Sequence, residues 1–284
     1  MRLQEQGVQP AGWADIDLSR TLSPLQELSS FLRKTVVIAE FEVRKLRHDP
    51  TELITRAVQP ALWLLIFGEV FSRIRAMPIP GNVPYLDFMS PGILAQSVLF
   101  IAIFYGIAAI WERDLGIVHK LLASPTPRPA LVLGKALSAG VRSLPQALFV
   151  YVLALLLGVK MNMNPLAWIV MLLAVLLGAA FFATLSLIIA CIVKTRERFM
   201  GIGQVLTMPL FFASNAIYPV SIMPAWLQVA SSVNPLTYMV DAVRTLMLAS
   251  WTSSFGLGFD FGVLIIATGI LVAIASRLYP GLAR

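Results

Sequence analysis

Few side chains in this sequence have the types and spacing that catalysis or metal binding requires. The single cysteine, Cys191, excludes internal disulfides and cysteine-based metal clusters, and two histidines, His48 and His119, leave little for a metal site. The chain has no Ser-His-Asp set and no phosphate-binding loop of the Gly-x-x-x-x-Gly-Lys-Ser/Thr type. We therefore expect no enzyme chemistry within the chain and no cofactor bound by it.

Three charged side chains in apolar surroundings are the remaining candidates for polar recognition. Arg142 either reaches phosphate head groups at a membrane surface or lines a substrate path, where it would attract an anion. Asp241 and Arg244 lie three residues apart on a predicted helix. That spacing favours a local ion pair over a substrate site.

The segment 112–125 has the pattern of a short amphipathic helix. Its apolar residues fall on one helical face, Glu112 stands at its start and Pro125 ends it. The apolar stripe consists of Leu115, Val118, Leu121 and Leu122. Such a helix can be held in a groove of a partner protein. The alternative is a membrane-surface helix that only joins two spans.

The composition indicates which elements must position these residues. The chain has 284 residues, of which 58% are hydrophobic before 18 glycines are counted, and only 13% are charged. A soluble domain carries about 25% charged residues. The composition therefore excludes a soluble enzyme, a disordered chain and a disulfide scaffold, and it predicts an all-α membrane protein. The net charge of +7 then reflects Lys and Arg residues that gather in cytoplasmic loops, and we expect no nucleic acid partner.

Runs without charge, compared with the roughly 20 residues that a spanning helix needs, predict six spans. These spans cover residues 54–72, 88–111, 143–159 with a start near 135–142, 166–190, 199–217 and 256–276. An amphipathic surface helix is predicted at 24–47. The chain thus divides into a cytoplasmic tail with this interface helix, 1–50, and a six-span domain, 51–284.

Four prolines break the long uncharged run 199–240, so that it cannot be two plain spans. After the fifth span we predict two short helices, about 222–232 and 235–248, that dip into the outer leaflet and return. With both termini inside, 18 of the 22 Lys and Arg residues lie on the cytoplasmic side. This asymmetry supports the six-span topology.

A series of motifs resembles the ABC-2-type exporter permeases, over about residues 30–278. The segment after the second span, with Leu121-Leu122-Ala123-Ser124-Pro125, is similar to the family's loop. The stronger match is Ala216-Ile217-Tyr218-Pro219-Val220, followed by Met223-Pro224-Ala225-Trp226-Leu227, Asn234-Pro235-Leu236-Thr237-Tyr238 and Asp241-Ala242-Val243-Arg244. Pro60 with Gly68 and Pro91-Gly92 also fit the family pattern.

This resemblance implies a permease subunit in the cell (inner) membrane. Two copies would enclose a path through the lipid bilayer above two copies of a separate ABC ATPase, which would hold ATP and Mg. The substrate expected is an amphipathic drug, a lipid or a lipid-linked glycan. The coupling contacts implied are Glu112, Leu115, Val118, Leu121, Leu122 and Pro125.

The residues near the short outer helices have two interpretations. Tyr218, Trp226 and Tyr238 form an outer gate or anchor the chain at the interface, with Pro219, Pro224, Asn234 and Pro235 shaping the backbone. Two alternatives for the whole chain remain: an ATP-independent secondary transporter or channel, for which intramembrane acids are scarce, and a membrane-embedded lipid-modifying enzyme, for which no polar catalytic cluster is seen.

Overall fold

The computed structural model describes residues 50–74, 83–124, 126–193 and 195–283, together with 29–31, 33–37, 40 and 79. These residues form helices and turns, with no strand among them beyond an isolated bridge between Met161 and Leu248. The predicted surface helix 24–47 lies outside the described residues except for positions 29–31, 33–37 and 40, which are helical. The predicted all-helical class is confirmed for the described part of the chain.

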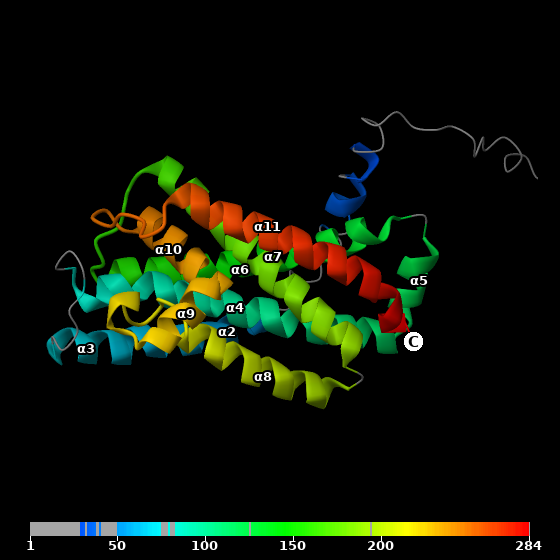
Figure 1. Cartoon of the computed structure of the whole chain (residues 1–284), viewed down its shortest axis with the longest axis horizontal. Helices are drawn as coiled ribbons and strands as arrows, with labels where there is room; N and C mark the ends of the chain where they lie inside the picture. Colours follow the sequence, from blue (N-terminus) through cyan, green and yellow to red (C-terminus); the bar gives the residue numbers. More distant parts are fainter. Residues whose placement is uncertain are drawn as a thin grey trace, which may run out of the picture.

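The helices form an elongated bundle whose two ends differ (Figure 1). In chain order they are α2 (Pro50–Leu62), the π-helical η1 (Trp63–Gly68), α3 (Glu69–Ile74), α4 (Tyr85–Asp114), α5 (Ile117–Ala123), α6 (Arg128–Leu156), α7 (Pro165–Ile192), α8 (Arg196–Phe212), the 3-10 turn η3 (Val220–Ile222), α9 (Ala225–Val233), α10 (Pro235–Met247), α11 (Leu257–Leu278) and the 3-10 turn η4 (Tyr279–Ala283). We name the two ends of the bundle the α5 end, which includes η4, and the α10 end, which includes α3 and α9.

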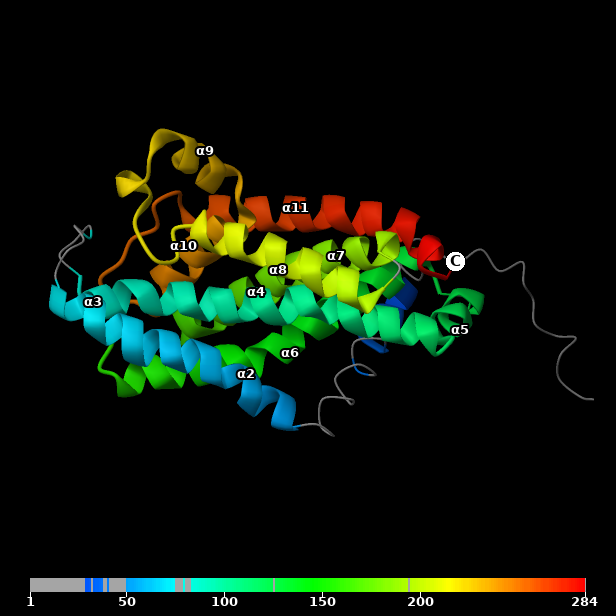
Figure 2. The same ribbon diagram turned by 90° about the horizontal axis from the view of Figure 1, so that it is seen from below.

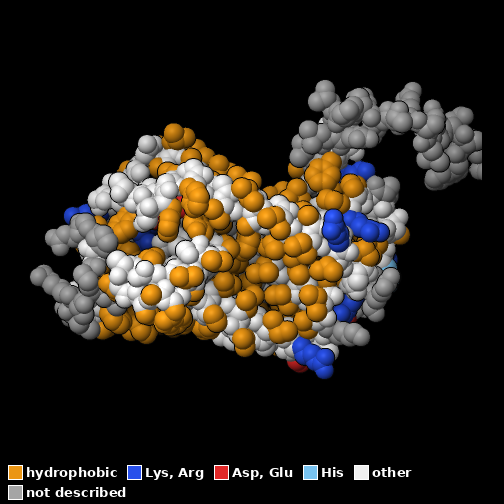
Figure 3. Space-filling model, viewed as in Figure 1, with side chains coloured by type: hydrophobic (Ala, Val, Ile, Leu, Met, Phe, Trp, Pro, Cys, Tyr) orange, Lys and Arg blue, Asp and Glu red, His pale blue; other side chains and the backbone are white. Residues whose placement is uncertain are grey.

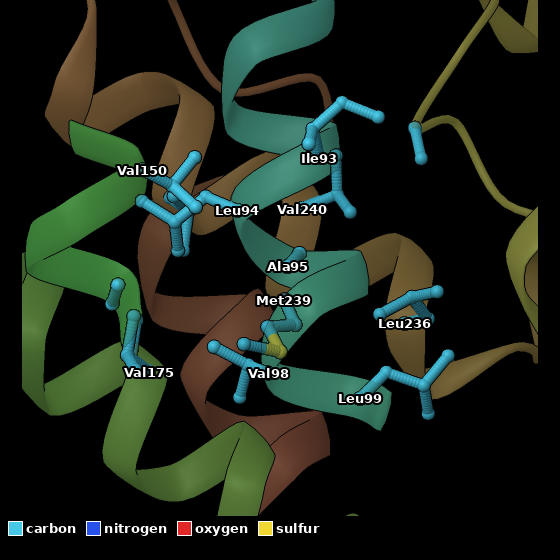
Figure 4. Packing of buried hydrophobic residues seen from close by; sticks show 14 of the residues in the cluster. Ile93, Leu94, Ala95, Val98, Leu99, Val150, Val175, Leu236, Met239 and Val240 are labelled. Atoms are coloured by element: carbon cyan, nitrogen blue, oxygen red, sulfur yellow. The ribbon is translucent and has the colours of Figure 1, made fainter. Parts of the chain in front are cut away.

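Four helices in the described part, α4, α6, α7 and α11, are long and apolar enough to cross a membrane. Helix α7 is the centre of the bundle, because it packs against α4, α6, α10 and α11. A Cβ at Gly178 of α7 would overlap the side chain of Met239 in α10, so the missing side chain permits this close packing. Figure 4 shows the apolar core where α4, α6, α7 and α10 meet, and Val98, Val175 and Met239 are among its residues.

The helical segment from Pro50 to Ile74 runs without a break. At the junctions, Leu62 and Glu69 keep helical backbone angles, so α2, η1 and α3 form one rod. Pro60 lies inside α2, where it removes one backbone donor. The rod lies along α4 and α6 (Figure 2).

Three predicted boundaries are corrected by the structure. Helix α6 begins at Arg128, before the predicted 135–142, because Glu112 neutralises Lys135 and the helix passes through this charge. Helix α8 ends at Phe212 and does not reach 217, since the carbonyls of Asn215 and Ala216 accept hydrogen bonds from Arg244 instead of continuing a helix.

The third correction concerns the short helix predicted over 112–125. Its first residues belong to the last turn of α4, which ends at Asp114. Gly116 then adopts φ +70°, a left-handed conformation that glycine tolerates, and α5 begins at Ile117. The connection is thus a sharp turn followed by a helix of seven residues.

The two short helices predicted after α8 are formed as α9 and α10. Pro224 precedes α9, and Asn234 separates it from α10. The Asn234 side chain accepts a hydrogen bond from the Leu236 N–H at 3.0 Å and donates to the Leu210 carbonyl at 2.6 Å. This one residue therefore caps α10 and ties it to α8, while α9 stands off the bundle (Figure 2).

Gly92 of α4 offers a test of how the α10 end is packed. A Cβ at this position would lie within 2.7 Å of the backbone of Ala216, in the turn after α8. We expect Gly92→Ala to destabilise the purified protein by about 1–3 kcal/mol, because backbone atoms cannot move aside as a side chain would. The measurement is thermal unfolding in detergent micelles, followed by tryptophan fluorescence.

Gly262→Ala is the matched control, since nothing lies within 4 Å of its Cβ position in α11. Alanine is the better helix former, so this variant should be as stable as the wild type or more so. A Gly92→Ala protein that unfolds no earlier than the Gly262→Ala protein would contradict the close contact with Ala216.

Candidate functional site

At the α5 end, the predicted apolar stripe is divided between the core and the surface. Val118 is fully buried, and Leu121 and Leu122 are half-buried against the same apolar cluster. Leu115, in contrast, is 66% exposed in the turn before α5. The stripe therefore anchors α5 on the bundle, and only Leu115 stays available to a partner. Pro125 lies outside the described residues.

Glu112 points into the bundle rather than toward a partner. It forms a buried ion pair with Lys135 of α6, and both side chains are more than nine-tenths buried. This pair joins α4 to α6 next to the α5 end. The local pattern of the sequence could not show it, because the two residues stand 23 positions apart.

A second polar contact at the α5 end joins α4 to the start of α8. The Arg196 guanidinium lies 2.6 Å from a carboxylate oxygen of Asp114 and 3.5 Å from the centre of the Trp111 ring. Thr195 caps α8 by accepting from the Arg198 N–H at 3.4 Å. Since Asp114 and Trp111 are exposed, this contact is on the surface and contributes little stability.

The C-terminal turn η4 completes the α5 end. Tyr279 and Leu282 are buried in the cluster that also holds Val118 and Phe199. The turn packs against α4, α5 and α7. Helix α5 is thus supported from two sides, and its exposed surface is the face that carries His119 and Lys120.

At the α10 end, Arg244 is the largest fully buried side chain in the described part of the chain. It donates to three backbone carbonyls, those of Phe88 at 3.2 Å, Asn215 at 2.7 Å and Ala216 at 3.4 Å. Its guanidinium also lies 3.9 Å from the centre of the Phe88 ring. Arg244 therefore connects α10 to α4 and to the turn after α8.

The predicted ion pair between Asp241 and Arg244 is not formed. Asp241 instead accepts hydrogen bonds from the Ser253 hydroxyl and the Ser254 N–H, both at 2.8 Å. The same Ser253 hydroxyl lies 3.2 Å from a carboxyl oxygen of Asp260 in α11. The i,i+3 spacing failed as a guide because the loop before α11 supplies closer donors to Asp241 than Arg244 does.

The predicted gate residues lie apart from one another. Tyr218 donates its hydroxyl to the Phe212 carbonyl, and partial burial raises the pKa of its phenol. Trp226 is 72% exposed on α9. Tyr238 packs against Phe255 and Phe259, with ring centroids 5.3 and 5.8 Å away. No ring contact joins the three, whereas Pro219, Pro224 and Pro235 stand where η3, α9 and α10 begin.

Between the two ends lies an open-sided cavity of about 310 Å³ that is lined by α2, α4 and α6. Its polar lining residues are Thr55, Arg56, Gln59, Gln96, Ser97 and Gln146, and its apolar lining residues are Pro60, Phe100, Ile101 and Phe104. Sequence reasoning missed this cavity because it counted only charges. The uncharged glutamines inside otherwise apolar spans were the signal that could have found it.

Arg142, the predicted substrate-path residue, is not among the residues that line the cavity. Its guanidinium lies 5.5 Å from the centre of the Tyr105 ring. The Tyr105 hydroxyl in turn is 3.0 Å from the Ser138 hydroxyl. Arg142 stands one helical turn before Gln146 on α6, and only Gln146 reaches the cavity.

The contribution of the buried Glu112–Lys135 pair to the stability of the fold can be tested by substitution. We expect Glu112→Gln to lower the free energy of unfolding by about 3–5 kcal/mol, because Lys135 loses the carboxylate that balances its buried charge. The double variant Glu112→Gln with Lys135→Met should recover part of this loss. The measurement is SDS-induced unfolding in mixed micelles.

Asp114→Asn is the matched control, since it removes the exposed carboxylate that pairs with Arg196. That change should cost no more than about 1 kcal/mol. A Glu112→Gln protein with wild-type stability would show that the buried pair contributes nothing to the fold.

Comparison with known proteins places these features in a family. The profile of the ABC-2 type transporter family matches residues 33–248. The putative transport permease ycf38 of Cyanophora paradoxa is 30% identical over 231 residues, which cover 80% of this chain and 79% of that protein. The daunorubicin resistance ABC transporter permease DrrB1 of Streptomyces coeruleorubidus is 25% identical, over 84% of this chain and 81% of its own.

The inner membrane transport permease YadH of Escherichia coli K12 is also 25% identical, over 75% of this chain and 81% of its own. The family match includes every described element from α2 to α10. With its apolar helices and this extent of similarity, the chain belongs to the ABC-2 type transporter family and is a membrane transport permease.

Proposed function

We propose that the chain is the permease subunit of an ATP-driven exporter, in which two copies enclose the translocation path. A separate ABC ATPase, also in two copies, drives it and holds ATP and Mg. Membership of the ABC-2 type family supports this function. The observation that carries it is the placement of α5, a short helix anchored at one end of the bundle with one face left exposed.

The proposed topology has six spans. Besides the four long helices, the α2–η1–α3 rod has 13, 6 and 6 residues, which exceeds the roughly 20 that a span needs. Helix α8, with 17 residues, is the remaining span. Helices α9 and α10 are then the pair that enters and leaves the outer leaflet.

The α5 end is the cytoplasmic side in this proposal, with both termini inside. Figure 3 shows that Lys and Arg side chains gather mainly toward this end, while hydrophobic side chains cover the middle of the same face. This distribution follows the positive-inside rule. Residues 1–50 then form the cytoplasmic tail and interface helix, and 51–284 the membrane domain.

A second copy is proposed to pack against α8 and α9. An apolar groove of about 680 Å³ runs between these helices, and Asn234 is the one polar side chain among its described lining residues. Val205 and Val233 in this groove are 74% and 76% exposed. A second copy would cover this face and supply the missing half of the path.

The substrate class proposed is an amphipathic drug, a lipid or a lipid-linked glycan, and the drug-resistance role printed in the name of DrrB1 supports the first.

The coupling proposal is tested by Leu115→Asp. If the exposed Leu115 side chain docks into the ATPase, losing its burial removes about 1.5–3 kcal/mol, which weakens association about 10- to 100-fold. The tagged chain is purified from membranes of its own host, and the co-purifying ABC ATPase is quantified by mass spectrometry. We expect the variant to insert and to unfold like the wild type but to lose the ATPase.

Leu166→Asp is the matched control, because Leu166 at the start of α7 has the same 66% exposure. It lies at the opposite end of the bundle, so ATPase recovery should not change. Equal recovery with Leu115→Asp and Leu166→Asp would reject Leu115, in the turn before α5, as a coupling contact.

The proposed topology is tested by thiol labelling in intact cells, in a background where Cys191 is replaced by serine. A cysteine at Met163, which is 78% exposed between α6 and α7, should react with a membrane-impermeant maleimide from outside. A cysteine at the exposed position Glu197, at the start of α8, should react only after the cells are opened. Labelling of position 197 in intact cells would contradict the six-span arrangement.

A further inference from the structure

The cavity between α2, α4 and α6 contains a polar group that the protein leaves unsatisfied. Gln96 of α4 is only 3% exposed, lines this cavity and has no hydrogen-bond partner among the described residues. A polar side chain that faces a cavity without a partner in the chain commonly marks a place where another molecule binds. The amide of Gln96 therefore indicates a ligand with polar atoms.

The other polar groups of the cavity favour a negatively charged ligand. Arg56 and Gln59 of α2 face the same space, and no acidic residue is among its described lining residues. Gln146 of α6 donates to the Arg56 carbonyl at 3.4 Å, so it braces the α2 backbone beside the cavity. Arg56 and three glutamines thus line the cavity, and guanidinium and amide groups are donors of the kind that bind phosphate and carboxylate oxygens.

The apolar side of the cavity fits the chain of an amphiphile. Phe100 and Phe104 of α4 form a stacked pair, with centroids 6.1 Å apart, next to Gln96. On α2, Val58 and Leu62, which flank the lining residues Gln59 and Pro60 in the sequence, are 54% and 49% exposed. A ligand head group in the cavity could therefore leave its hydrocarbon chain along an apolar surface.

The depth of the cavity is consistent with a membrane ligand. At 1.5 Å per residue, Gln96 lies about 16 Å from the Tyr85 end of α4 and about 27 Å from the Asp114 end. Polar residues so far from both ends of a spanning helix mark a functional site by default. The volume of about 310 Å³ matches a head group rather than a whole lipid.

We propose that this cavity binds the anionic head group, phosphate or carboxylate, of an acyl-chain amphiphile. Arg56 and Gln96 contact the anion, and Phe100 and Phe104 contact the first part of the chain. This assignment rests on the proposed export function, for which the cavity would be a binding site for the substrate within each protomer.

The test uses purified full-length protein in nanodiscs of phosphatidylcholine. Three photoactivatable probes are added at equal mole fraction: phosphatidylglycerol, a free fatty acid and phosphatidylcholine, each with a diazirine near the head-group end of the acyl chain. We expect one or both anionic probes to label peptides of α2 and α4 at least fivefold more than the phosphatidylcholine probe. Labelling by phosphatidylglycerol alone identifies a phosphate ligand, and labelling by the fatty acid alone identifies a carboxylate ligand.

Matched variants distinguish this site from general lipid contact. Gln96→Leu and Arg56→Gln should each lower labelling by the anionic probes at least fivefold, whereas Gln204→Leu and Arg198→Gln, at exposed positions of α8, should not. Gln96→Leu should unfold at the wild-type temperature or above, since leucine removes an unsatisfied amide; a merely structural glutamine would give the opposite result.

Equal labelling by anionic and phosphatidylcholine probes, or labelling unchanged by Gln96→Leu, would overturn the proposal. The assay needs no ATPase, so its outcome is independent of the coupling test with Leu115→Asp. If Leu115→Asp keeps the ATPase while the anionic probes still label the cavity selectively, the coupling proposal fails and the cavity assignment stands. If Leu115→Asp loses the ATPase while labelling is not selective, only the cavity assignment fails.

Discussion

The constraint on which this structure depends is that polar groups among apolar helices must find partners within the chain. Arg244 meets it most completely, because its buried guanidinium satisfies the carbonyls of Phe88, Asn215 and Ala216. Those carbonyls belong to α4 and to the turn that ends α8. The break after α8, the absence of a side chain at Gly92 and the position of α10 are therefore parts of one arrangement.

At the α5 end, buried charged side chains meet this constraint by forming an ion pair. Glu112 and Lys135 neutralise each other between α4 and α6, and a cluster that includes Val118 and Tyr279 closes over the adjacent helix ends. Both ends are thus fixed by contacts between distant residues. The middle differs, because Gln96 there lines a cavity. The bundle is therefore tied together at both ends, and its polar-lined cavity lies between them.

Much of the fold could be predicted from the sequence, because charge-free runs report directly on helices among apolar surroundings. The predicted spans 88–111, 166–190 and 256–276 lie within three residues of α4, α7 and α11. The starts of α6 and α5 and the end of α8 were not predicted, since each depends on a tertiary contact. The same holds for the sites: Leu115 is exposed as a coupling residue requires, but the burial of Glu112 and the cavity around Gln96 required the packing of three helices.

The double support of α5 has a mechanical consequence. Helix α5 is joined to α4 by the sharp turn at Gly116 and rests on η4, which continues directly from α11. A load applied to the exposed face of α5 is therefore shared by two helices that are far apart in the chain. Through the Glu112–Lys135 pair the load also reaches α6. A small displacement at this end would tilt three helices together as a lever, without requiring any of them to bend.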